Sequence, residues 1–378
     1  MTRTLLLVIA VIIIAVIAAL ATACSHAGGP AGVHAPADGA SSDAPTPVCA
    51  SGACLEPPSC AVPAMGTTDC GASHESCCVS PEVPGGTYHR TYDPVEDGGP
   101  VVSADGGPTG EADPATVSGF RLDKYLVTVG RFRQYLNYVT GPTGAPPAAG
   151  GGIHTHLNGG RGLANSASPG TFETGWDANW NQEIATGPGA ASAWDDNLTS
   201  CLAYSTWTPT TGSQENLPMN CVNWYEAYAF CIWDGGFFPS EAEWEYAAAG
   251  GSQERAYPWG STDPGTTNQY AIYNCNYGGA GGNCASIASM APVGTAVLGA
   301  GLWGQLDLAG EVFEWNLDWY ASYVNPCIDC AYLTTASDRA MRGGNYAGSA
   351  INLTASDRSF YDNPTDSDNV IGFRCARP

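Results

Sequence analysis

The stretch that decides the fold is Leu217–Gly251, which reads LPMNCVNWYEAYAFCIWDGGFFPSEAEWEYAAAGG. It predicts two short helices in succession. The first begins after Asn223, whose side chain is a preferred helix N-cap, and runs to Trp233 before a pair of glycines ends it. The second opens with a capping box at Ser240–Glu243 and closes at another pair of glycines. Both helices carry large apolar side chains, so we expect both to pack against the core.

The flanking sequence adds a strand and a third helix. Phe120 and Leu122 alternate with polar residues, as in a half-buried strand, and Thr128 then provides an N-cap. Apolar side chains recur at helical spacing over Val129–Val139, which predicts a helix there. Residues 141–220 show no sustained period, so we expect ordered loop; short strands and turns follow the second central helix.

The composition is that of a loop-rich globular protein with a strong negative charge. Of 378 residues, 48 are Gly and 27 are Pro, whereas only 13% are charged, which excludes a coiled coil or a helical bundle. Lys and Arg number 13 against 36 Asp and Glu, a formal net charge of -23 at pH 7. Such a surface repels phosphate backbones, so nucleic acid is excluded as a partner, whereas divalent cations are compatible with it.

The N-terminus has the pattern of a secretory signal. A positive charge precedes the apolar run Leu5–Leu20, small residues follow, and Cys24 comes next. We expect residues 1–23 to be a signal peptide and Cys24 to be lipidated, although Ala21 stands where lipoproteins favour Leu. The alternative is an uncleaved membrane anchor over residues 4–23, which are just enough to span a bilayer.

The cysteine content agrees with an oxidising compartment. The chain has 15 cysteines, too many for a reducing cytosol unless they bind metal, and an even number remains once Cys24 is set aside. We therefore expect a protein of the bacterial cell envelope, attached to the membrane through its lipid and facing the periplasm or the exterior.

Three further segments follow the signal peptide. Residues 24–48 are small and polar and cannot form a core, so they predict a disordered tether. Residues 49–80 hold six cysteines and predict a stapled segment; six cysteines allow 15 connectivities, so their pairing stays open. Residues 84–378 form one long module.

Five blocks of this module carry a family resemblance. They are Phe120–Val139, Leu217–Gly251, Tyr257–Gly260, Pro292–Tyr320 with the motif DLAGEVFEWNLDWY, and Arg342–Arg374, which begins with RGG and ends with GFR. The module resembles the formylglycine-generating enzyme (FGE, or sulfatase-modifying factor) family. That resemblance implies an α+β domain with a variant of the C-type lectin fold: loop-rich, with short antiparallel strands, few helices and disulfide staples. The sequence departs from the family at Phe237-Phe238, where the family has Arg-Leu.

The resemblance implies an activity for which this sequence lacks the residues. Active members of the family are copper-dependent oxidases that convert a sulfatase cysteine to formylglycine with two cysteines of their own, located between the RGG and GFR blocks. Here no cysteine occurs from Ala331 to Arg374, and alignment on Arg358 places Ala355 at the second cysteine position. Because copper(I) needs soft thiolate ligands, we expect no copper, no catalytic residue and no formylglycine-generating activity.

Another branch of the family uses a three-histidine iron site. All six histidines lie at or before His156, and the close pair is His154-Thr155-His156 in a Gly-rich loop. Such a pair is more often hydrogen-bonded within its loop than bound to metal, so we expect no iron.

The remaining cysteines are expected to be structural. The family resemblance implies a disulfide between Cys231 and Cys375. The simplest local pairs are then Cys201–Cys221, Cys275–Cys284 and Cys327–Cys330. The last pair is a C-x-x-C motif, for which redox activity is the alternative; its surroundings predict a loop rather than a helix N-terminus, so we interpret it as a staple.

The resemblance also implies a structural calcium site in the turn GEVFEW. The matching positions are Asp307, Gly310, Val312 and Glu314, with side chains from the first and last and backbone carbonyls from the other two. This set is chemically sensible because Ca²⁺ prefers hard, partly anionic oxygen ligands. The alternative is that Asp307 and Glu314 are ordinary exposed acidic residues.

Two functions of different classes remain open. In the first, the module is a non-catalytic binding or structural unit whose groove recognises a peptide, protein or glycan. The expected groove residues are Asn345, Tyr346, Arg358 and Tyr361. In the second, the module is an enzyme of the family that acts in oxidative maturation of secreted proteins or peptides. The missing cysteines and histidines favour the first function, since fold alone does not specify activity.

Overall fold

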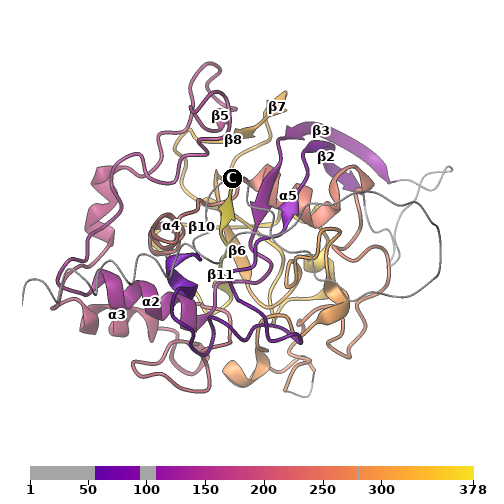
Figure 1. Cartoon of the computed structure of the whole chain (residues 1–378). Helices are drawn as coiled ribbons and strands as arrows, with labels where there is room; N and C mark the ends of the chain where they lie inside the picture. Colours follow the sequence, from indigo (N-terminus) through magenta and orange to yellow (C-terminus); the bar gives the residue numbers. More distant parts are fainter. Residues whose placement is uncertain (1–55, 94–107, 279–280) are drawn as a thin grey trace, which may run out of the picture. The chain divides into compact units, whose positions relative to one another are not determined.

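The computed structural model describes residues 56–93, 108–278 and 281–378 (Figure 1). Within it, Leu55–Pro378 form one compact unit. The expected signal peptide, the lipidation site Cys24, the tether, and Cys49 and Cys54 lie outside the described residues. No helix of the described part is long and apolar enough to cross a membrane.

The helices are short, and α2, α4 and α5 begin where the sequence predicts. The α-helices are α2 (Val129–Val139), α3 (Ala191–Leu198), α4 (Trp224–Trp233) and α5 (Glu241–Ala249). The 3-10 helices are η1 (Pro58–Cys60), η2 (Ala178–Glu183), η3 (Leu202–Tyr204), η4 (Gly251–Gln253), η5 (Ile287–Ser289), η6 (Val297–Gly299) and η7 (Ala350–Leu353).

The expected caps form. The Thr128 side chain accepts the Arg131 N–H at the start of α2, and both α4 and α5 open with complete capping boxes, from Asn223 and Ser240 respectively. Gly250 ends α5 in the left-handed conformation, with φ of 67°, which a glycine adopts without a steric penalty.

The prediction of continuous loop over residues 141–220 is wrong at α3. The apolar pair Trp194 and Leu198, one helical turn apart, is buried, and the Trp194 indole N–H donates to the Ala185 carbonyl at 2.8 Å. A single pair is too short to register as a period, and burial against the core stabilises the helix instead.

The strands are short and mostly antiparallel. They are β1 (Glu82–Val83), β2 (Gly86–Asp93), β3 (Thr109–Val117), β4 (Phe120–Leu122), β5 (Ala164–Asn165), β6 (Phe313–Trp319), β7 (Cys327–Ile328), β8 (Cys330–Ala331), β9 (Arg339–Arg342), β10 (Phe360–Asp362), β11 (Ile371–Gly372) and β12 (Ala376–Arg377). They form sheets in the orders β10-β9-β6-β11, β1-β4-β12, β2-β3-β7 and β5-β8. The pairs β6–β11, β3–β7 and β5–β8 are parallel and the other pairs are antiparallel.

The buried core surrounds β6, in which all seven residues are buried. Helices α2 and α4 pack against each other, with the Phe132 and Phe230 rings stacked at a centroid distance of 5.7 Å. Helix α5 contacts β2, β3, β6 and β9, so this helix joins the central sheet to the β2–β3 hairpin (Figure 1).

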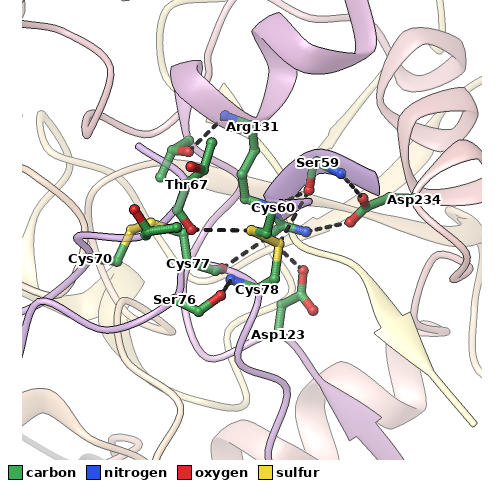
Figure 2. Close-up of a disulfide and its surroundings, with 12 residues drawn as sticks. Ser59, Cys60, Thr67, Cys70, Ser76, Cys77, Cys78, Asp123, Arg131 and Asp234 are labelled. Atoms are coloured by element: carbon green, nitrogen blue, oxygen red, sulfur yellow. Dashed lines mark hydrogen bonds and ion pairs between the residues drawn. A yellow bond between two sulfur atoms is a disulfide. The ribbon is translucent and has the colours of Figure 1, made fainter. Parts of the chain in front are cut away.

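Residues 56–80 are built into the same unit. Disulfides Cys60–Cys78 and Cys70–Cys77 close this segment on itself, which settles the pairing of these four cysteines (Figure 2). The boundary expected at residue 84 therefore does not divide the structure: the stapled segment packs on α2 through η1.

A buried arginine of α2, Arg131, binds the stapled segment through hydrogen bonds to Ser59 and Cys77. The guanidinium of Arg131 donates to Ser59 Oγ at 3.0 Å, to the Cys77 carbonyl at 3.2 Å, to Asp123 Oδ2 at 2.9 Å and to Asp234 Oδ2 at 2.7 Å (Figure 2). The side chains of Arg131, Asp123 and Asp234 are fully buried. We call these five residues the Arg131 network; it links the stapled segment to α2 and to the C-terminal end of α4.

Candidate functional site

The thiols of the described residues are all in disulfides. The pairs are Cys60–Cys78, Cys70–Cys77, Cys201–Cys221, Cys231–Cys375, Cys275–Cys284 and Cys327–Cys330. The last four are the pairs that the sequence analysis expects. A disulfide sulfur is not a thiolate, so the described part of the chain offers no cysteine ligand to copper in this state.

The position expected for the second catalytic cysteine is occupied by a core residue. Ala355 is 1% exposed and belongs to the same hydrophobic cluster as Trp244 and Leu308. Its N–H donates to the Ala256 carbonyl at 2.9 Å. A methyl group in this setting binds no metal and reaches no substrate.

Arg358, one of the expected groove residues, is held rigidly by Glu241 at the start of α5. Its Nε lies 2.6 Å from Glu241 Oε1, and its second amino nitrogen lies 2.9 Å from Glu241 Oε2. Burial alone would raise the pKa of the Glu241 carboxyl, but Arg358 and Arg342 bring it below its ordinary value. The pair is therefore ionised, and its bidentate geometry fixes the guanidinium plane.

Aromatic rings surround this guanidinium. It lies 4.6 Å from the ring centre of Tyr320 and 4.3 Å from that of Tyr323, within the range of cation–π attraction. Tyr361, which is 48% exposed, stacks on Tyr320 with the ring centres 4.0 Å apart. We call Tyr320, Arg358 and Tyr361 the tyrosine surface; it is preorganised, and one of its rings faces solvent.

The other two expected groove residues do not join the tyrosine surface. Tyr346 is 1% exposed and packs in a cluster with Ile272 and Met290. The Asn345 amide oxygen accepts the N–H groups of Ala347 and Gly348, at 2.8 and 2.9 Å, so it shapes a turn. The prediction that Asn345 and Tyr346 line a groove is therefore wrong. Tyr346 is buried, and the Asn345 side chain is hydrogen-bonded within its own turn, so neither is available to contact a ligand.

A second buried arginine shares Glu241 with Arg358: the Arg342 Nε lies 3.5 Å from Glu241 Oε1. The Arg342 guanidinium contacts the Glu245 carboxylate, which also accepts the Tyr323 hydroxyl at 3.2 Å. Burial raises the pKa of Glu245 to about 7, against the lowering effect of Arg342. Glu241 and Glu245 lie one turn apart on α5, so one helix face neutralises both arginines.

The expected calcium turn is tightly folded. Asp307 and Gly310 have left-handed backbones, with φ of 59° and 87°. The Asp307 carboxylate is buried and accepts the Gly294 N–H at 2.7 Å. Burial raises the pKa of Asp307 to about 6, and the charge of Glu314 adds to this effect. The alternative of exposed acidic residues is thus wrong, since Glu314 is also buried.

Glu314 has a partner that the sequence analysis does not anticipate. Its carboxylate is bound by Arg374 of the GFR block, with Nε to Oε2 at 2.6 Å and the second amino nitrogen to Oε1 at 2.9 Å. The residues fit a calcium ion only in part. The Asp307 carboxylate could bind the ion, but the Glu314 carboxylate would have to bind the ion and the Arg374 guanidinium at the same time.

His154 is a structural histidine. It is fully buried, its Nδ1 lies 3.0 Å from both carboxylate oxygens of Glu173, and its Nε2 lies 3.2 Å from Glu243 Oε2. Burial alone would lower its pKa, but Glu243 and Glu173 raise it to about 10. The imidazolium is therefore enclosed by two carboxylates, which agrees with the prediction of a hydrogen-bonded loop residue.

The sequence analysis misses Tyr320 and Tyr323, which frame Arg358. Their signal is the run Trp319–Tyr323, WYASY, directly after the E-W-N-L-D segment.

These features define a class: a disulfide-stapled α+β domain of the lectin-like type, with two short capped helices and a buried central strand. The chain belongs to the family described as the sulfatase-modifying factor enzyme 1-like domain (FGE-sulfatase), whose sequence model matches residues 76–378.

Individual relatives agree with this membership. The chain is 35% identical over 168 residues to the formylglycine-generating enzyme of Streptomyces coelicolor, an alignment that covers 43% of this chain and 52% of the relative. It is 29% identical over 175 residues to the inactive C-alpha-formylglycine-generating enzyme 2 of Bos taurus, over 44% and 53%. The chain thus spans about half the length of these relatives.

A solved structure is also similar. The structure of PvdO from Pseudomonas aeruginosa superimposes with a TM-score of 0.45 and 19% sequence identity, over 78% of this chain and 92% of that chain.

Proposed function

We propose that this chain is an envelope lipoprotein whose domain binds a ligand and does not generate formylglycine. The observation that carries the proposal is the state of the thiols. Each cysteine of the described residues is in a disulfide, and no cysteine lies between Cys330 and Cys375. The copper-binding pair that the family's oxidases use therefore has no counterpart in this segment.

Copper does not fit the residues that replace the pair. Copper(I) is selected by soft thiolate or thioether sulfur, and the segment Asn345–Tyr361 contains neither Cys nor Met. Ala355 in its core offers only a methyl group. The similarity to a relative named as an inactive enzyme supports the idea that the domain can persist without this chemistry.

The tyrosine surface is the part of the expected groove that suits recognition. Arg358 is fixed by Glu241 and the rings of Tyr320 and Tyr323, so little side-chain entropy is lost when a ligand binds. Tyr361 adds an exposed, stacked ring, the kind of residue that contributes large contact area at binding sites. A peptide, protein or glycan could each use such a ring.

The test uses a labelled sulfatase-type cysteine peptide and, in parallel, a glycan array. We expect the protein to bind the peptide or a glycan of the array saturably, without chemical conversion of either. Tyr361→Ser should weaken it roughly 2–10-fold, the loss that follows from removing one aromatic contact of about 0.5–1.5 kcal/mol. Tyr138→Ser is the matched control, because Tyr138 is also partly exposed and stacks on Trp233. Absence of binding by both probes, or equal effects of the two substitutions, would contradict the proposal.

A structural Ca²⁺ and a lipid anchor complete the proposal. The calcium ligands would be Asp307 and Glu314 with the carbonyls of Gly310 and Val312, and the ion would offset the buried charge of Asp307.

The anchor would be Cys24, since the apolar run and small residues before it form a secretory signal. Mass spectrometry that finds residues 1–23 in the mature protein would reject the anchor.

The enzyme alternative is oxidative maturation of secreted proteins or peptides. It is favoured by the 35% identity to a relative named as a formylglycine-generating enzyme. Metal analysis of the purified protein separates the two: copper or iron bound in stoichiometric amount would favour the enzyme, and its absence after purification in copper-supplemented medium would favour the binding module.

A further inference from the structure

The β2–β3 hairpin carries a group of metal-ligating side chains that belongs neither to the disulfides nor to the tyrosine surface. His89 lies on β2, Glu111 lies on β3, and Glu254 directly follows η4. One ligand atom from each of the three residues lies within 4.8 Å of the other two. Antiparallel pairing of β2 with β3 holds the first two, with Thr91 opposite Ala112 beside Glu111.

Glu254 is the buried member of the group. Its side chain is 5% exposed, and its Oε1 accepts the His89 N–H at 2.8 Å and lies 3.0 Å from His89 Nδ1. Its other carboxylate oxygen, Oε2, is buried and has no hydrogen-bond partner. An unpartnered buried oxygen of this kind is costly, so a proton or a cation is expected to occupy the position beside it.

Glu111 places a second carboxylate at the same position. A carboxylate oxygen of Glu111 lies within 4.8 Å of the ligand atoms of Glu254 and His89. Two carboxylates at short distance, with a half-exposed imidazole as their neighbour, hold more negative charge than that imidazole can balance. A divalent cation would balance the two charges and bond to the free oxygen.

We propose that His89, Glu111 and Glu254 form a binding site for Zn²⁺. Zinc is bound in proteins by imidazole nitrogen and carboxylate oxygen at about 2.0–2.2 Å, often with three protein ligands and a water molecule. Two ligands of one tetrahedral zinc ion then lie roughly 3.4 Å apart, and the ligand atoms of the three residues already lie within 4.8 Å of one another.

The chemistry favours zinc over calcium at this position. Ca²⁺ takes six to eight oxygen ligands, whereas this group supplies one nitrogen and two carboxylates. Glu111 is exposed and can move toward the ion, and the His89 side chain, 37% exposed, leaves an entry path from solvent. A bound ion would join β2, β3 and the turn after η4, and would add to the Glu254–His89 contacts and to the hydrogen bond from the Tyr92 hydroxyl to the Arg255 carbonyl.

The experiment titrates Zn²⁺ into the full-length chain, purified in detergent and freed of metal with a chelator. Binding is followed by calorimetry and by the melting temperature. We expect Zn²⁺ to raise the melting temperature of the native protein, and the affinity to fall at least tenfold in Glu111→Gln and in His89→Ala. Glu111→Gln tests the site without disturbing the fold, because Glu111 is exposed.

The control is His74→Ala, which removes another exposed histidine and should leave the zinc affinity unchanged. Cysteines and histidines outside the described residues contribute equally to all four proteins, so the difference between them reports this site. Equal zinc affinities in the native protein, Glu111→Gln and His89→Ala would overturn the proposal, as would the absence of any zinc-dependent stabilisation. Neither result depends on the ligand of the tyrosine surface.

Discussion

Replacing Arg131 by methionine should weaken the packing of the stapled segment, residues 56–80, on the rest of the unit. In the native protein this guanidinium makes four buried contacts, two of them to carboxylates that are themselves fully buried. Methionine fills much of the same space but donates no hydrogen bond. The substitution would leave Asp123 and Asp234 facing each other across the space that the positive charge occupied, with Arg377 as the remaining cation beside them.

The magnitude follows from the burial of the pair. Removing one partner of a buried ion pair typically costs about 3–5 kcal/mol, because the remaining charge stays desolvated. The Cys77 carbonyl and the Ser59 hydroxyl lose a donor as well, although each can recover part of this through water. Domains are stable by roughly 5–15 kcal/mol in total, so Arg131→Met should remove a large part of the stability of this unit.

The assay is urea unfolding of the oxidised protein, with hydrogen exchange over residues 56–80 as a local readout. Arg131→Met should lower the free energy of unfolding by about 3–5 kcal/mol and speed exchange in that segment first. Arg131→Lys keeps the charge and should lose less, so it remains informative if the methionine variant fails to fold. Arg161→Met is the surface control, since Arg161 is exposed and, among the described residues, contacts the Asn158 carbonyl through a hydrogen bond and the Phe172 ring, with no carboxylate partner. A loss no larger than that of Arg161→Met would refute the reasoning.

Three further predictions concern staples, calcium and pH. Cys231→Ser should cost about 5 kcal/mol in the free energy of unfolding and Cys327→Ser about 2 kcal/mol, because their disulfides span 144 and 3 residues; equal losses in urea unfolding would contradict this. Ca²⁺ should raise the melting temperature and Asp307→Asn should abolish the rise, whereas equal melting temperatures of the native protein with Ca²⁺ and with chelator would show that the site is empty. The melting temperature should fall from pH 5 to pH 9, since the pKa of Glu226 is raised to about 8 and that of His154 to about 10 in the folded state. The unfolded chain releases these two protons near pH 4.5 and 6.5, whereas the folded state keeps them to higher pH. The stabilisation is therefore complete below pH 4.5 and 6.5 respectively and is lost as the pH rises. A rise over the same pH range would contradict these assignments.

The parts of the fold that could be predicted from the sequence are those decided over a few residues. Asn223 and Ser240 start helices because each side chain meets the N–H of the third helical residue, an interaction that the local sequence specifies alone. The left-handed Gly250 ends α5 for a similarly local reason. The family resemblance extends the prediction to the Cys231–Cys375 disulfide.

The parts that could not be predicted depend on residues far apart in the chain. Arg131 and Asp234 are separated by 103 positions, and Glu314 and Arg374 by 60, so no local pattern links them. The prediction that Tyr346 lines a groove is wrong, because its side chain packs into the core with Ile272 and Met290. Which face a loop residue presents is decided by tertiary packing, which periodicity does not report in an irregular segment.

The most direct test of the account is aldehyde formation in a sulfatase-type cysteine peptide incubated with the purified protein, with and without added copper. A relative that is an active formylglycine-generating enzyme serves as the positive control under the same conditions. We expect no aldehyde in either case, because the described cysteines are in disulfides and Ala355 stands at a cysteine position. Aldehyde that accumulates with turnover, and that disappears on substitution of a single residue of this chain, would contradict it.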